Sequence, residues 1–139
     1  MKENYIHFIG IGGISMSSLA HILLHSGKKV SGSDTAKTHL TDELEALGAK
    51  ISIGQRAENI TNPDLVVYTA AISDDNEELC AARNKGIRCI ERAYLLGEIM
   101  KRYGMPIAVS GTHGKTTTTS MLAHVLLSAD ADPTVTVGG

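Results

Sequence analysis

The sequence has few cysteines, little net charge and no long apolar run, and each shortage excludes a class of protein. Cys80 and Cys89 are too few for a disulfide framework or a four-ligand zinc site, so we expect reduced thiols in a cytoplasmic protein. The net charge of −2, with Lys and Arg unclustered, gives no reason to expect nucleic acid as a partner. No run approaches the ~18 apolar residues of a membrane-spanning helix, and residues 1–4 lead directly into an expected strand. We therefore expect no membrane segment and no signal peptide.

Short apolar runs alternate with amphipathic segments along most of the chain, which indicates an α/β fold. Strands are expected at residues 5–9, 30–33, 50–53, 65–68 and 87–90. Helices are expected after them, ending near Gly27, Gly48, Gly86 and Gly104. A capping box starting at Asp75 should begin the third helix. Alternating strands and helices with short connections predict a Rossmann-like three-layer domain, with a parallel sheet covered on both faces.

A glycine turn follows the first expected strand. Residues 10–15 read Gly-Ile-Gly-Gly-Ile-Ser, a dinucleotide-binding pattern with Ser15 in place of the third glycine. Asp34 ends the second strand, where that fold places an acid that bonds a nucleoside. The expected binding residues are Gly10, Ile11, Gly12, Gly13, Ile14, Ser15, Asp34, Thr69, Ala70 and Ala71. A turn that serves only tight packing of strand against helix would look similar.

A second glycine turn lies near the end of the chain. A strand is expected at residues 107–109, and apolar residues recur at helical spacing after Gly114. A strand, a glycine turn and a helix start bind phosphate, because free N–H groups and the helix dipole face one point. Lys115 is expected to reach the β- and γ-phosphates of ATP, and the Thr116 hydroxyl to bind Mg²⁺. The residues expected to bind ATP are Gly111, Thr112, His113, Gly114, Lys115, Thr116 and Thr117.

This second turn departs from the common P-loop at one position. Val109 stands where the first glycine is usual, and Gly111 comes two residues later. A chance Gly-Lys-Thr at a helix start is the alternative, but the flanking strand and helix favour phosphate binding.

Two phosphate-binding turns about a hundred residues apart indicate two different nucleotides. A dehydrogenase needs only the first turn and a simple NTPase only the second. Together they suggest a ligase or kinase acting on a nucleotide-linked substrate. Two alternatives stay open: an NAD-binding redox domain, supported by Gly10, Gly12 and Asp34, and a non-catalytic nucleotide-binding module with a regulatory role.

As a set, these motifs resemble the Mur ligases. The resemblance runs from His7 to Gly139 and is carried by residues 7–13, 16–17, 32–34, 92–96, 111–119 and 138–139. It implies an ATP-dependent enzyme that joins L-alanine to the carboxylate of UDP-N-acetylmuramate through an acyl phosphate. It also implies that the turn at residues 10–15 holds the pyrophosphate and that Asp34 reads the uridine. Lys115 and Thr116, with Mg²⁺, would then be the catalytic residues.

The resemblance also implies the domain organisation. Residues 1–104 would form the UDP-sugar-binding domain, and residues 105–139 the start of the central ATP-binding domain. We therefore expect the front portion of a longer protein, without ligase activity of its own. Apolar residues in 105–139 should pack against the first domain, pair with another copy of the chain, or be poorly ordered.

Three histidines near the N-terminus, His7, His21 and His25, are expected to be structural. His7 opens the first strand and should pack or cap rather than act as a base. His21 and His25 lie one helical turn apart, but no third metal ligand is evident, which favours a solvated helix face. Gln55 stands where relatives often have His.

Overall fold

The computed structural model describes residues 1–108, 114–128 and 133–135. Within this part of the chain, five parallel strands form a sheet in the order β3-β2-β1-β4-β5. The strands are β1 (Tyr5–Ile9), β2 (Lys29–Asp34), β3 (Lys50–Ile53), β4 (Leu65–Tyr68) and β5 (Arg88–Glu91). The order reverses beside β1, so the chain crosses the sheet after β3. The predicted doubly wound α/β fold is confirmed.

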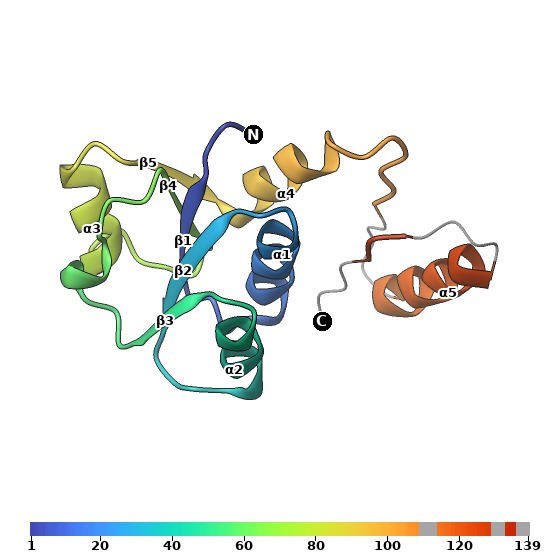
Figure 1. Ribbon diagram of the computed structural model, residues 1–139, viewed down its shortest axis with the longest axis horizontal. Coiled ribbons are helices and arrows are strands. Elements are labelled where there is room, and N and C mark those ends of the chain that lie inside the picture. The colour runs from blue at the N-terminus through green and yellow to red at the C-terminus, as the bar shows by residue number, and fades with distance from the viewer. Residues whose placement is uncertain (109–113, 129–132, 136–139) are drawn as a thin grey trace.

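Helices cover both faces of the sheet (Figure 1). One face carries α1 (Ile14–His25), α2 (His39–Ala46) and α4 (Arg92–Met100), and the other carries α3 (Glu77–Asn84) and the 3-10 turn η1 (Ala57–Asn59). On the first face Phe8 lies in one core cluster with Leu19 of α1 and Leu95 of α4. On the second face Val66 lies in a smaller cluster with Leu79 of α3. Successive residues of a strand therefore serve different cores.

The start of α3 differs from the prediction by one residue. Its cap is Asn76, whose side-chain oxygen accepts the backbone N–H groups of Glu78 and Leu79 at 3.0 and 3.1 Å. Asp75, the predicted cap, lies one position too early. Asn76 is better suited because its Nδ2 donates to Gln55 Oε1 at 2.9 Å, which fixes the side chain while its oxygen caps the helix. Gln55 thus has a structural partner on α3.

The chain after residue 104 follows the prediction in its helix but not in its strands. α5 (Lys115–Ser128) begins directly after Gly114. The strand predicted at 107–109 is absent over its described residues, 107 and 108, and Val109 lies outside the described residues. A strand needs a neighbour for its backbone hydrogen bonds, and none of the described strands pairs with this segment. The apolar pattern of residues 134–137 also predicts a strand, but Thr134 and Val135, its described residues, are irregular.

Apolar side chains of this last segment face solvent. Ile107 is 50% exposed, Met121 66%, Val125 63% and Val135 43%. In Figure 1 α5 stands clear of the sheet. Whether this segment packs against the first domain, pairs with another copy of the chain or is poorly ordered stays a prediction. In the described ranges no helix has both the length and the apolar character needed to span a bilayer.

Candidate functional site

The turn after β1 is fixed to the end of β2. Gly10 has a φ of +85°, a conformation that glycine adopts without strain. Its N–H and that of Ile11 both donate to the carbonyl oxygen of Ser33, at 2.8 and 2.9 Å. One backbone oxygen of β2 therefore sets where the turn leaves the sheet.

Asp34 braces the same turn through its side chain. Asp34 Oδ2 accepts the Gly12 N–H at 2.8 Å, and Oδ1 accepts the Thr35 N–H at 2.7 Å. A Cβ on Gly12 would lie 2.7 Å from Asp34 Oδ2, so glycine is required for this approach. Asp34 Oδ1 also accepts the Thr35 hydroxyl at 3.4 Å, whereas Oδ2 retains a second lone pair. Asp34 can therefore hold the turn and still accept a hydrogen bond from a nucleoside.

The turn leads into the N-terminus of α1, which is open. Gly13 occupies the cap position and is exposed, and no side chain caps the helix. Within the described part of the chain, the N–H groups of Ile14, Ser15 and Met16 have no acceptor. Unpaired N–H groups at the positive end of a helix dipole bind an anion such as a phosphate. The predicted residues Gly13, Ile14 and Ser15 thus lie where an anion would be held.

The sheet order brings the other predicted residues to the same edge. β1 lies between β2 and β4, so the glycine turn, Asp34 and residues 69–71 all follow the carboxyl ends of neighbouring strands. The Ile72 N–H donates to the Thr69 carbonyl at 3.0 Å, which closes a turn over Ala70 and Ala71. Both alanines are exposed, so this turn presents small side chains to the crevice where ligands of this fold bind.

Arg92 lies beside the candidate site, although the sequence analysis did not select it. It is the first residue of α4, and its Nη1 donates to Ser15 Oγ at 2.8 Å. A guanidinium therefore lies beside the N-terminus of α1, where it adds a positive charge to the helix dipole. The available signal was the position of an arginine directly after β5, since that strand also ends at the carboxyl edge.

The second glycine turn is described only at its end. Gly114 has a φ of +75°, and Lys115 is the first helical residue of α5 and is exposed. The Gly114 carbonyl accepts the Thr118 N–H at 2.9 Å, which closes the first helical turn. Gly111, Thr112 and His113 lie outside the described residues, as do the side chains of Thr116 and Thr117. The described part matches the glycine-to-helix half of the predicted phosphate loop.

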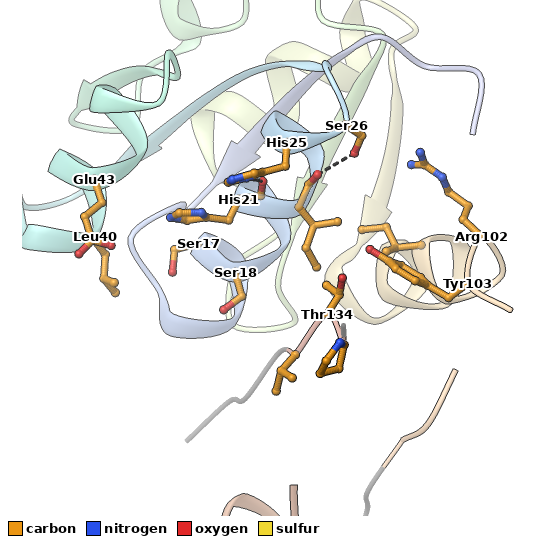
Figure 2. Close-up of a pocket in the computed structure, with 14 residues that line it drawn as sticks. Ser17, Ser18, His21, His25, Ser26, Leu40, Glu43, Arg102, Tyr103 and Thr134 are labelled. Carbon is orange, nitrogen blue, oxygen red and sulfur yellow. Dashed lines mark hydrogen bonds between the residues drawn. The ribbon is translucent and has the colours of Figure 1, made fainter. Parts of the chain in front are cut away.

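A hollow of about 810 Å³ lies away from both turns, between α1, the end of α4 and residues 133–135 (Figure 2). It is lined on α1 by His21 and His25, whose rings stack with centroids 5.7 Å apart. Across the described ranges no group of three potential metal-ligating side chains occurs, here or elsewhere. None of the predicted site residues lines this hollow.

Comparison with known proteins identifies close relatives. A family model for the Mur ligase family, catalytic domain, matches residues 5–104. The UDP-N-acetylmuramate–L-alanine ligase of Clostridium botulinum (strain Okra / Type B1) is 57% identical over 138 residues, and that of Clostridium kluyveri (strain ATCC 8527) 60% identical over 140 residues. These matches cover 99% and 100% of this chain but 30% and 31% of the relatives. The chain thus spans about 30% of the length of these curated relatives.

Solved structures give the same result. The crystal structure of the UDP-N-acetylmuramate-alanine ligase of Thermotoga maritima matches with a TM-score of 0.85 and 42% identity, over 91% of this chain and 30% of that one. The UDP-N-acetylmuramate:L-alanyl-γ-D-glutamyl-meso-diaminopimelate ligase of Neisseria meningitides matches with a TM-score of 0.82 and 35% identity, over 91% and 40%. The sequence-based resemblance is confirmed on independent grounds, and the chain belongs to the Mur ligase family.

Proposed function

We propose that this chain is the sugar-nucleotide-binding part, together with the first part of the ATP-binding domain, of a cytoplasmic enzyme of peptidoglycan precursor synthesis. The enzyme joins L-alanine to the carboxylate of UDP-N-acetylmuramate. One observation carries the proposal. The braced glycine turn at residues 10–15 opens the N-terminus of α1 in a chain 57% to 60% identical to ligases named for these two substrates.

The turn and its neighbours would bind the sugar nucleotide. The pyrophosphate would be held by the open N–H groups of α1, with the Arg92 guanidinium beside them. Asp34 would accept a hydrogen bond from the uridine part through the remaining lone pair of Oδ2. Thr69, Ala70 and Ala71 would form the adjoining wall of the crevice. In this arrangement residues 1–104 supply binding and orientation of one substrate.

The second turn would hold ATP and Mg²⁺. The described residues fit such a ligand, because Gly114 opens a helix whose first residue, Lys115, is an exposed cation. Gly111, Thr112, His113, Gly114 and Thr117 would surround the phosphates, and the Thr116 hydroxyl would be a Mg²⁺ ligand. ATP supplies the phosphoryl group that activates the carboxylate. Lys115 would neutralise charge between the phosphates and the carboxylate.

The choice of amine substrate would lie outside this part of the enzyme. The two solved relatives have similar TM-scores, 0.85 and 0.82, and both titles give UDP-N-acetylmuramate. Their titles differ in the second substrate, alanine in one and a tripeptide in the other. A shared domain fold with different amine substrates supports the proposal that this chain binds the sugar nucleotide. L-alanine follows from the relatives at 57% to 60% identity.

Calorimetric titration of the chain tests the proposal. UDP-N-acetylmuramate should bind, and NADH should give no heat. Arg92→Met should weaken UDP-N-acetylmuramate binding about tenfold through loss of a charge-assisted contact. The matched control is Arg88→Met. Arg88 lies at the amino end of β5, away from the carboxyl ends of the strands, and pairs with Glu3. Binding of NADH in preference to UDP-N-acetylmuramate would instead support a redox domain.

Ligase activity is expected only from a longer protein. The chain alone, supplied with both substrates, ATP and Mg²⁺, should form no amide bond, because it spans about 30% of the length of the curated relatives. Amide formation by these 139 residues would contradict the assignment of the remaining machinery to other segments.

A further inference from the structure

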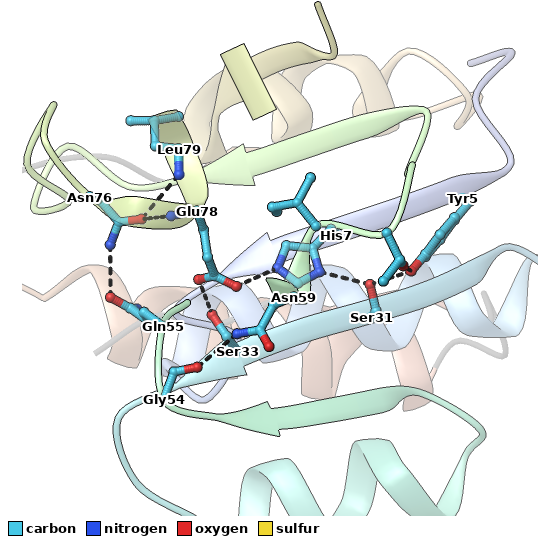
Figure 3. Close-up of polar contacts among 12 residues, drawn as sticks. Tyr5, His7, Ser31, Ser33, Gly54, Gln55, Asn59, Asn76, Glu78 and Leu79 are labelled. Carbon is cyan, nitrogen blue, oxygen red and sulfur yellow. Dashed lines mark hydrogen bonds and ion pairs between the residues drawn. The ribbon is translucent and has the colours of Figure 1, made fainter. Parts of the chain in front are cut away.

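A chain of buried polar side chains crosses the α3 face of the sheet (Figure 3). His7 of β1 and Glu78 of α3 are 1% and 0% exposed, and His7 Nε2 lies 3.0 Å from Glu78 Oε1. His7 Nδ1 lies 2.8 Å from Ser31 Oγ on β2. The other Glu78 oxygen, Oε2, accepts the hydroxyl of Ser33, two residues further along β2. The proposed binding roles use none of these four side chains.

Burying the Glu78 carboxylate costs free energy unless hydrogen-bond donors in the protein replace the water it loses. A buried carboxylate requires donors on both oxygens, and His7 and Ser33 provide them. Glu78 also lies in the first turn of α3, where the helix dipole favours negative charge. Among the described residues no buried polar side-chain atom lacks a partner. Complete pairing makes such a network rigid.

Ser33 connects this network to the glycine turn. Its side chain is held by Glu78, while its carbonyl oxygen accepts the N–H groups of Gly10 and Ile11 at 2.8 and 2.9 Å. Ser33 also precedes Asp34, which braces Gly12. Ser31 lies on the same strand and the same face and is also buried, but its backbone pairs within the sheet and does not contact the turn.

We propose that Ser33 and Glu78 are positioning residues for the pyrophosphate-binding turn. Glu78 holds the Ser33 side chain, and this fixes the Ser33 carbonyl that sets the path of residues 10–12. The carboxylate on α3 thereby acts on the ligand-binding edge through β2, without touching the ligand. That the turn binds a pyrophosphate rests on the proposed function. That Ser33 and Glu78 fix the path of the turn does not.

Two matched substitutions separate this role from a purely structural one. Ser33→Ala and Ser31→Ala each remove one buried hydroxyl from β2, at 0% and 3% exposure. Ser33→Ala should weaken UDP-N-acetylmuramate binding about tenfold, as expected when a bond to a charged group is lost. Ser31→Ala should leave the affinity within about twofold, because the altered bond does not reach the turn.

Amide hydrogen exchange gives a readout that needs no ligand. In Ser33→Ala the Gly10 and Ile11 amides should exchange about tenfold faster relative to the Val67 amide, which reports overall opening of the sheet. Ser31→Ala should change all three amides by a common factor. If Ser33→Ala does not fold, Glu78→Gln can be used instead. It should raise the exchange rates of the Gly10 and Ile11 amides by a smaller factor, since the glutamine side chain retains only one acceptor oxygen.

The outcomes distinguish the two proposals. A chain that does not bind UDP-N-acetylmuramate overturns the proposed function, while faster exchange confined to Gly10 and Ile11 still supports the positioning role. Equal affinity losses in the two serine variants would overturn the positioning role. So would exchange rates of the Gly10 and Ile11 amides that change by the same factor as the rate of the Val67 amide.

Discussion

The contact between Gly12 and Asp34 leads to a sharp prediction about stability. A Cβ at Gly12 would lie 2.7 Å from Asp34 Oδ2, and 3.2 Å from both Asp34 Cγ and Thr41 Cγ2. The carboxylate cannot simply rotate aside, because its other oxygen accepts the Thr35 N–H at 2.7 Å. Gly12→Ala should therefore break the bond from Gly12 N–H to Asp34, the brace of the turn.

The expected loss follows from the kind of bond that breaks. A hydrogen bond to a charged group contributes about 1.5–3 kcal/mol, and the half-buried position of Asp34 lets water replace part of it. We therefore expect Gly12→Ala to lower the free energy of unfolding by about 1.5 kcal/mol. With an m-value of about 2 kcal/mol/M, the urea midpoint should fall by about 0.75 M.

Gly13→Ala is the matched control in the same turn. Gly13 has φ −64° and ψ 149°, which any residue adopts, and the nearest atom to an added Cβ is 3.6 Å away. Its urea midpoint should stay within about 0.25 M of the wild-type value, corresponding to about 0.5 kcal/mol. Equal midpoints for the two variants would refute the argument that Asp34 and Gly12 are locked together.

Two further predictions concern the rest of the domain. Asp64 accepts the backbone N–H groups of Asn4 and Tyr5, which lower its pKa from the ordinary value of 3.8. The stability it contributes is present above that value and is lost as pH falls through the lower folded pKa. Asp64→Asn should therefore have a lower free energy of unfolding than wild type at pH 7. In acid-denaturation curves this difference should narrow below about pH 3.8, and a difference independent of pH would contradict the argument. Leu19→Ala should cost about 2–5 kcal/mol in urea denaturation, because Leu19 is fully buried in the larger core. Ile14→Ala on the same helix, at 58% exposure, should cost less than about 0.5 kcal/mol, and a similar loss in both would rule out this account of the core.

Features that depend on local sequence could be predicted well. β1, β3 and β4 have the predicted bounds, because each is a short run of residues suited to a strand with helix or turn signals on both sides. The glycine turn and Asp34 were also expected at the carboxyl ends of neighbouring strands, and they lie there. The direct bond from the Gly12 N–H to Asp34 was not predicted. These inferences need only the order of elements along the chain.

Contacts between distant side chains could not be predicted. Arg92 and Ser15 are separated by 77 positions, and His7 and Glu78 by 71. Neither pair has a spacing signature, because the crossing of helices and strands determines which side chains meet. The strand predicted at 107–109 failed over its described residues for a related reason. An apolar run becomes a strand only when another strand offers it hydrogen-bond partners.

The polar network beneath α3 shows that stability alone does not explain this face of the sheet. Valine or isoleucine in place of Ser31 and Ser33 would each bury apolar area worth about 1.5–3 kcal/mol, whereas buried ion pairs often give little net stability. Apolar contacts are non-directional, however, and would leave the end of β2 free to adjust by small shifts. The paired oxygens of Glu78 fix the orientation of Ser33, and hence of the carbonyl that holds Gly10 and Ile11. If the turn presents its N–H groups to a pyrophosphate, as proposed, it requires that orientation, which would account for a carboxylate buried on the opposite side of β2 from the main core.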